Sequence, residues 1–287
     1  MPSELTTVID LVTGREFIAG IAIGAVALVA VIAVPSRLRT HWGLLLAAST
    51  MVGINVAFEQ RLVLSFGVTL LAIGGWVADR YKTTPVLSYV GWVIVALGAI
   101  AIPRGTPKLE SVWIEVGVPL AVVGLGWALK GWQALPQSNL LGLLVFITAG
   151  GIWATVPDTD AARVFLGASI PLAIATIEPL RSRISFSGAL ALSGVIVSIV
   201  VSGGAERPAS IAGGLACAGI LVMLPAMGAR TQGLGRTVVI ASHVVVVLIA
   251  SRMFGLWERT IPAVVGLALL GMVAYAVLTW LTNRATP

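Results

Sequence analysis

Three ionisable side chains lie inside long apolar stretches of this sequence: Glu115, Arg163 and His243. A charged group within a membrane segment costs about 2.5–3.5 kcal/mol on insertion scales, so such groups are candidates for binding a solute or moving an ion. We predict a substrate-binding role for all three. Glu115 and Arg163 are expected at the same depth, where the two could pair. The structural alternatives are that Glu115 reaches water, that Arg163 anchors a helix at the interface and that His243 bonds a carbonyl.

Other sets of reactive residues are sparse. Asp158 and Asp160 stand two residues apart, but no further carboxylates follow at helical spacing. This pattern favours helix capping over metal or diphosphate binding. The chain has two histidines and one cysteine, Cys217, and so lacks the ligand sets for haem or zinc. We therefore expect no cofactor, no metal site and no enzymatic activity.

The composition is that of a membrane protein. Apolar residues make up 58% of the 287 residues and charged residues only 10%, with a mean hydropathy of +1.01. Soluble domains carry about 25% charged residues. The net charge of +6 comes from basic residues scattered between apolar runs, which argues against nucleic-acid binding. We expect an all-α polytopic protein of the cell (cytoplasmic) membrane.

The apolar runs are long enough to cross a hydrocarbon core as helices, which takes about 20 residues. Reading the runs between charged residues predicts eleven transmembrane helices joined by short loops, with no extramembrane domain. Their expected limits are 17–34, 42–58, 62–78, 85–102, 112–129, 139–156, 161–177, 184–201, 211–227, 237–255 and 261–281.

The basic residues set the expected orientation. Placing the N-terminus outside and the C-terminus inside puts the loops with Arg37, Arg39, Arg181 and Arg183 in the cytoplasm and most acidic residues outside. This distribution follows the positive-inside rule.

A repeated sequence segment predicts an internal duplication. The segment Pro35–Arg39 reads Pro-x-Arg-x-Arg, and Pro179–Arg183 repeats it 144 residues later, about half the chain length. The chain then divides into a first five-helix repeat (1–132), a linking transmembrane helix (133–156) and a second five-helix repeat (157–287). Because five helices and a sixth give an even number of crossings, the halves run in the same direction, as a parallel repeat.

The repeat supports the choice of candidate residues. Glu115, Arg163 and His243 each align with an apolar position in the other half. Groups that break the internal symmetry mark places where a duplicated scaffold has specialised.

Most tryptophans are expected at the membrane surfaces. Trp42, Trp76, Trp127 and Trp132 lie near the ends of expected helices, where the indole ring favours the interface, whereas Trp92 lies well inside one.

Two functions fit these features. The first is a permease or flippase for a small or lipid-linked solute, with its pathway between the two repeats. The alternative, favoured by the scarcity of buried polar groups, is a non-catalytic membrane subunit or scaffold of a larger envelope complex. The expected partners are the lipid bilayer, the solute and, for the alternative, a membrane or envelope protein.

One loop has a family resemblance. Gly75–Lys82 resembles the cytoplasmic Gly-x-x-x-Asp-Arg motif of the major facilitator superfamily, whose halves are also parallel repeats. The motif follows the third expected helix here rather than the second, and it lacks a later glycine. Drug/metabolite transporters have a similar size, but their ten helices form inverted halves. The sequence is assigned to neither family.

Overall fold

The computed structural model describes most of the first seven-tenths of the chain, and the part that it describes is all-helical. The described residues are 13–33, 41–57, 62–104, 112–132, 141–156, 160–176, 183–203, 211, 214, 215, 217, 218 and 221. The helices are α2 (Arg15–Ala33), α4 (Trp42–Ala57), α5 (Leu62–Arg80), α6 (Pro85–Arg104), α7 (Val112–Gly131), α8 (Leu141–Thr155), α9 (Asp160–Ile174) and α10 (Phe186–Gly203).

These helices coincide with the first eight expected ones, and their ends differ from the expected limits by at most three residues. The agreement has a physical cause. An apolar run in lipid must satisfy its own backbone hydrogen bonds, and a helix does so within one segment. The tenth and eleventh expected helices lie outside the described residues, as does most of the ninth.

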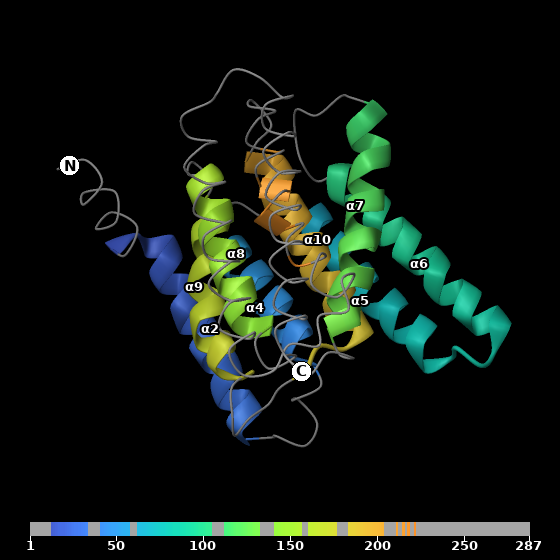
Figure 1. The fold of residues 1–287 in the computed structure, drawn as a ribbon, viewed down its shortest axis with the longest axis horizontal. Coiled ribbons are helices and arrows are strands. Elements are labelled where there is room, and N and C mark those ends of the chain that lie inside the picture. Colours follow the sequence, from blue (N-terminus) through green and yellow to red (C-terminus); the bar gives the residue numbers. More distant parts are fainter. Residues whose placement is uncertain are drawn as a thin grey trace, which may run out of the picture.

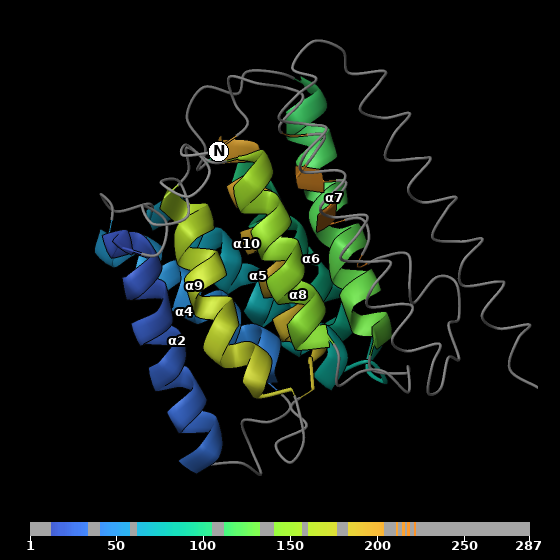
Figure 2. The same ribbon diagram turned by 60° about the vertical axis from the view of Figure 1, so that its left-hand side comes forward.

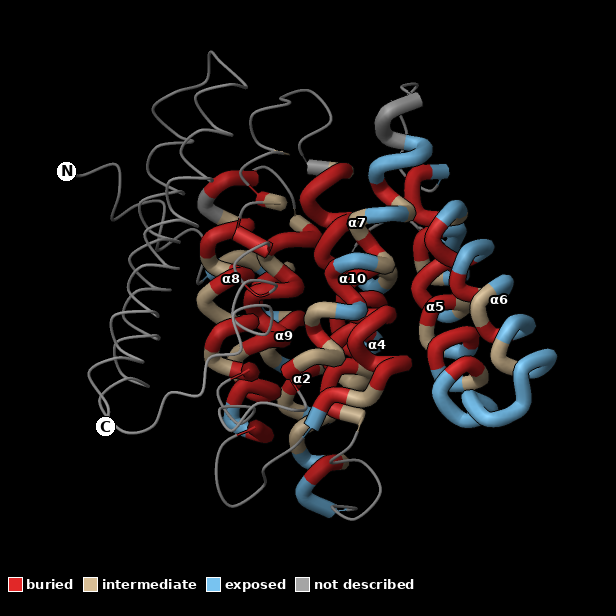
Figure 3. The backbone as a smooth tube through the Cα atoms, turned by 45° about the vertical axis from the view of Figure 1, so that its right-hand side comes forward, coloured by how far each residue is buried: buried red, intermediate tan, exposed pale blue. Residues whose placement is uncertain are grey.

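Three of the described helices, α2, α5 and α6, are long and apolar enough to cross a membrane. Figure 3 shows that many residues along α6 are exposed. Among them are large apolar side chains on one side of the helix that no described part of the chain covers. They are Val86, Leu87, Tyr89, Val90, Val93, Leu97 and Ile100. A contiguous apolar face of this kind indicates contact with lipid or with another protein rather than with water.

The helix α10 forms the centre of the bundle. Its residues from Phe186 to Val201 are all buried, and α4, α5 and α7 pack around it. Figures 1 and 2 show α10 between the side of the molecule formed by α2 and α9 and the side formed by α6 and α7. Residues that begin or end near α10 are therefore brought together from distant parts of the chain.

Helices α2 and α9 run side by side in the same direction (Figure 2). A Cβ atom on Gly20 would collide with the carbonyl oxygen of Val164, and one on Gly24 would lie 2.8 Å from the carbonyl oxygen of Ala168. Only glycine lets the two backbones approach this closely, as in other small-residue helix contacts in membranes.

Helices α4 and α10 also run in the same direction and meet at their first turns. The backbone N–H of Trp42 donates to the carbonyl oxygen of Arg183 at 3.3 Å. A Cβ atom on Gly188 would lie 2.7 Å from the backbone nitrogen of Leu44. This close contact fixes the starts of both helices against each other.

Trp42 and Trp132 lie at helix ends but are buried, so they do not face outward as rings of an aromatic belt do. Each is 1% exposed, and each indole N–H donates to a carbonyl oxygen of another segment, Trp42 to Leu172 at 2.6 Å and Trp132 to Leu221 at 2.8 Å. The carbonyl oxygen of Leu172 also accepts the backbone N–H of Ala175 at 3.2 Å, so the indole of Trp42 is a second donor to it. Each buried indole thus links its helix to a segment distant in the sequence. Trp76 and Trp127 are more than half exposed, as the interfacial prediction requires.

Candidate functional site

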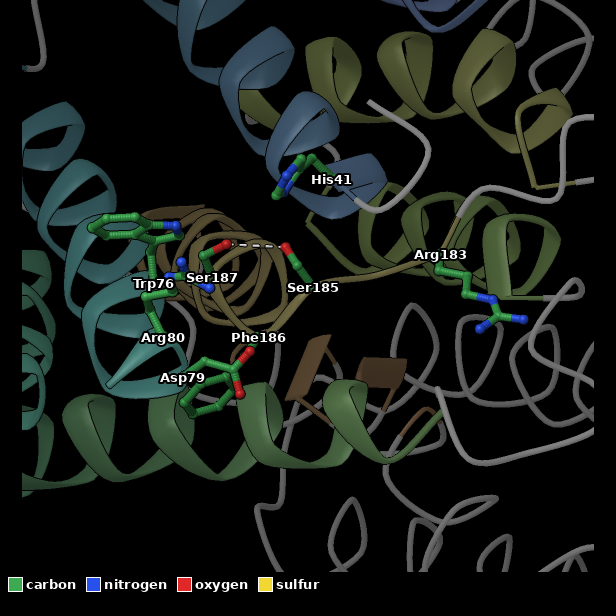
Figure 4. A pocket seen from close by; sticks show the side chains of 8 residues that line it. All are labelled: His41, Trp76, Asp79, Arg80, Arg183, Ser185, Phe186 and Ser187. Carbon is green, nitrogen blue, oxygen red and sulfur yellow. Dashed lines mark hydrogen bonds between the residues drawn. The ribbon is translucent and has the colours of Figure 1, made fainter. Parts of the chain in front are cut away.

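A cavity of about 420 Å³ lies at one end of the bundle, where α5 ends and α4 and α10 begin (Figure 4). Its size falls within the range of about 300–1,000 Å³ that is typical of small-molecule sites. Among the described residues, its lining combines cations, one carboxylate, hydroxyls and aromatic rings. These residues are His41, Trp76, Asp79, Arg80, Arg183, Ser185, Phe186 and Ser187.

Glycines bring the three helices together beside this cavity. The contact of Gly188 with Leu44 joins α4 to α10, as described above. On the other side, a Cβ atom on Gly75 would lie 3.0 Å from Cα of Ser187, so α5 also approaches the α10 backbone closely. The end of α5, which carries Asp79 and Arg80, is thereby held next to the first turn of α10.

The first turn of α10 is capped by Ser185. Its side-chain oxygen accepts the backbone N–H of Gly188 at 3.2 Å and lies 2.9 Å from the hydroxyl oxygen of Ser187 (Figure 4). Capping by serine satisfies one of the N–H groups that a helix start leaves free. The N–H groups of Phe186 and Ser187 have no acceptor within the helix. Two hydroxyls and a helix N-terminus therefore border the cavity.

Among the described residues, the cavity has more positive than negative charge. Lys130, from the end of α7, lies 3.2 Å from the carboxylate of Asp79, and its ammonium lies 4.2 Å from the ring centre of Phe186. With 34% and 49% of these side chains exposed, solvent screens the pair, which contributes little stability. It does neutralise the carboxylate of Asp79. Among the described residues, neither Arg80 nor Arg183 makes an ion pair, so the cavity keeps a positive charge.

His41 is the remaining polar group of the lining. Its Nδ1 atom is buried and has no hydrogen-bond partner among the described residues. Buried polar atoms are almost always paired, so an unpaired one at a cavity wall is a group that a bound molecule can satisfy. Arg183 contributes less, since Figure 4 shows its side chain extending away from the other lining groups.

Of the residues proposed from the sequence, Glu115 and Arg163 do not line this cavity. Glu115 is exposed in the first turn of α7. Arg163 lies at the start of α9, where its guanidinium is 3.7 Å from both Glu16 and Asp160. The expected pair of Glu115 and Arg163 is absent from the described residues, and α7 and α9 lie on opposite sides of α10 (Figures 1 and 2). His243 lies outside the described residues.

Sequence reasoning missed the cavity because its residues come from three separate helix ends. Arg183 belongs to the repeated Pro-x-Arg-x-Arg segment, which reads as an interfacial anchor. Asp79 and Arg80 were noted only within a loop motif. The signal that was present is Ser185 three residues before Gly188, a capping serine placed next to basic residues.

Comparisons of the chain with protein-family models, with curated proteins and with solved structures found no match.

Proposed function

We propose that the protein is a multi-pass permease or flippase of the cell (cytoplasmic) membrane that moves a small or lipid-linked solute between its two halves. The observation that carries the proposal is the position of the cavity. Its walls come from α4 and α5 of the first half and from α10 of the second half. Solute sites in transporters built from two repeats lie at the interface between those repeats.

Three close contacts support the proposed duplication with eleven helices and two parallel five-helix halves. Gly20 meets Val164, Gly24 meets Ala168, and Gly188 meets Leu44. In each pair the two residues are 144 residues apart, the spacing of the repeated basic segment. When two equivalent parallel helices pack about a two-fold axis along the membrane normal, each residue faces its own counterpart. These contacts are therefore what a parallel duplication predicts.

The proposed orientation supports a cytoplasmic entrance. With the N-terminus outside, α5 and α7 end in the cytoplasm and α4 and α10 begin there, which puts the cavity on the cytoplasmic side. The ion pair of Arg163 with Glu16 then lies at the outer ends of α9 and α2. It joins the two halves on the side opposite the cavity, as expected of a state open to the cytoplasm.

The alternative is a non-catalytic subunit or scaffold of a membrane complex. It is favoured by the way buried hydroxyls are used. Those of Thr50, Ser193 and Ser198 each donate to a carbonyl oxygen three or four residues earlier in the same helix. Such groups stabilise helices in lipid and offer little to a solute.

Flux measurements in proteoliposomes separate the two functions. A panel of labelled small solutes and fluorescent lipids is offered to vesicles that contain the wild type, Arg80→Gln or Lys82→Gln. Lys82 is exposed two residues beyond the helix end and does not line the cavity, so its variant is the matched charge control. We expect flux of at least one solute with the wild type and with Lys82→Gln, and a loss of about fivefold or more with Arg80→Gln, the effect of about 1 kcal/mol.

The same vesicles test the residues proposed from the sequence. Glu115→Gln and His243→Ala should each lower flux if these residues belong to the pathway, and unchanged flux in both excludes them. Absence of flux for the whole panel, together with a stable partner that co-purifies in mild detergent, would favour the scaffold.

A further inference from the structure

We propose that the cavity at the starts of α4 and α10 binds a phosphate group, carried either by a free phosphate compound or by a lipid headgroup. This inference rests on the proposed function in one respect, namely that the cavity is the solute entrance, and it names the class of solute. The first argument is charge. Because Lys130 neutralises Asp79 at 3.2 Å, the Arg80 guanidinium is left as a cation facing the cavity without a carboxylate partner among the described residues.

The second argument is the set of hydrogen-bond donors. The hydroxyls of Ser185 and Ser187, 2.9 Å apart, reach the same cavity as the first-turn N–H groups of α10. The N-terminus of a helix carries roughly half a positive charge, and its free N–H groups point outward along the axis. A phosphate combines several acceptor oxygens with a full negative charge, whereas a sugar is uncharged and a carboxylate has only two acceptor oxygens.

The third argument concerns the rest of the lining, which would contact an organic group attached to the phosphate. Nδ1 of His41 is buried without a partner, so a ligand oxygen or hydroxyl near it would satisfy it. Trp76 and Phe186 add aromatic side chains to the lining. Bare phosphate would occupy only part of about 420 Å³. The remaining space and the aromatic side chains fit an organic group attached to the phosphate.

Titration calorimetry on the purified full chain in detergent tests the proposal, with inorganic phosphate as the probe and chloride at the same ionic strength as the reference. We expect saturable phosphate binding by the wild type. Arg80→Gln should weaken it by about fivefold, since charge-assisted hydrogen bonds to an anion are the strong ones. Lys82→Gln, which removes one positive charge two residues along the chain and outside the lining, should change the affinity by less than about twofold.

A second variant acts in the opposite direction. Asp79→Asn removes the carboxylate from the lining and frees the ammonium of Lys130, so it should tighten phosphate binding by about two- to fivefold. Lys130 and Asp79 are 34% and 49% exposed, so solvent screens their pair and its loss should not unfold the protein. Equal weakening by Arg80→Gln and Lys82→Gln, or no tightening by Asp79→Asn, would overturn the assignment of the cavity as the phosphate site.

The source of the phosphate is decided in lipid nanodiscs. Native mass spectrometry of the protein from discs with phosphatidic acid or with phosphatidylcholine reports retained lipid. Selective retention of phosphatidic acid that Arg80→Gln abolishes assigns a lipid headgroup. Phosphate binding without lipid retention assigns a free phosphate compound. Absence of both refutes the proposal.

This test is independent of transport. If the wild type binds phosphate and no solute crosses proteoliposomes, the proposed function fails and the binding site stands. If flux occurs and phosphate neither binds nor competes, the proposed function stands and the assignment of the ligand class fails.

Discussion

Replacement of Trp42 by alanine is expected to lower the free energy of unfolding by about 3–5 kcal/mol, the usual cost of deleting a fully buried large aromatic side chain. Trp42 is 1% exposed and lies where α4, α9 and α10 meet. The truncation opens a void and removes the donor to the carbonyl oxygen of Leu172. Unfolding by SDS in mixed micelles, followed by circular dichroism, measures the change.

Two further variants separate the contribution of the hydrogen bond from that of the buried ring. Trp42→Phe keeps most of the volume and removes the hydrogen bond, so it should cost about 0.5–1.5 kcal/mol, because the carbonyl oxygen of Leu172 keeps the backbone N–H of Ala175. Trp127→Ala is the comparison, because Trp127 is 53% exposed on α7 and should cost only about 1–2 kcal/mol, from the loss of its stacking on Trp92. If Trp42→Ala and Trp127→Ala have the same effect, Trp42 does not join helices as described.

The second large effect is expected at the contact of α2 with α9. Gly20→Leu should lower the free energy of unfolding by about 3 kcal/mol or more, because overpacking usually costs about 1–3 kcal/mol and here the obstacle is backbone. A Cβ atom at this position collides with the carbonyl oxygen of Val164, and a backbone atom cannot rotate away as a side chain does. Fluorescence-detected size exclusion after heating reports the loss as a lower melting temperature.

Gly124→Leu is the control for Gly20→Leu. Gly124 lies in α7 with nothing within 4 Å of a Cβ atom, and it is exposed. Leucine has a higher helix propensity than glycine, so this variant should be neutral or more stable by up to about 1 kcal/mol. A melting temperature for Gly20→Leu equal to that of the wild type would contradict the close parallel packing of α2 and α9.

The helices could be predicted from the sequence, whereas the site could not. The length of each apolar run is enough to predict the eight described helices, because an apolar segment in lipid satisfies its backbone hydrogen bonds by forming a helix. The sequence also indicates the depth of a residue in the membrane. Glu115 and Arg163 are predicted at the same depth, so a pair between them is possible on that ground alone. The sequence does not give the position of each helix around the bundle. The structure puts α10 between their two helices, and Arg163 pairs with Glu16 instead.

The sequence does not distinguish buried from exposed tryptophans, for a related reason. An indole near a helix end is interfacial if lipid headgroups surround it and structural if neighbouring helices bury it and supply a carbonyl acceptor. The sequence shows Trp42 and Trp127 in similar settings, yet one donates to Leu172 and the other stacks on Trp92 with ring centres 6.0 Å apart. Only the packing of neighbouring helices separates the two cases.

The proposed carrier depends on a positive charge at Arg80 in the cavity between the halves. The most direct test is flux in proteoliposomes of Arg80→Cys in a Cys217→Ala background, where the native thiol, which is buried, is removed. Radiolabelled inorganic phosphate and a fluorescent short-chain phosphatidic acid are the probes. Arg80→Cys should lose flux of the transported probe, a cationic thiosulfonate reagent should restore it, and an anionic reagent of similar size should not. Flux of both probes at the level of protein-free vesicles, or flux that ignores the charge at position 80, would contradict the account.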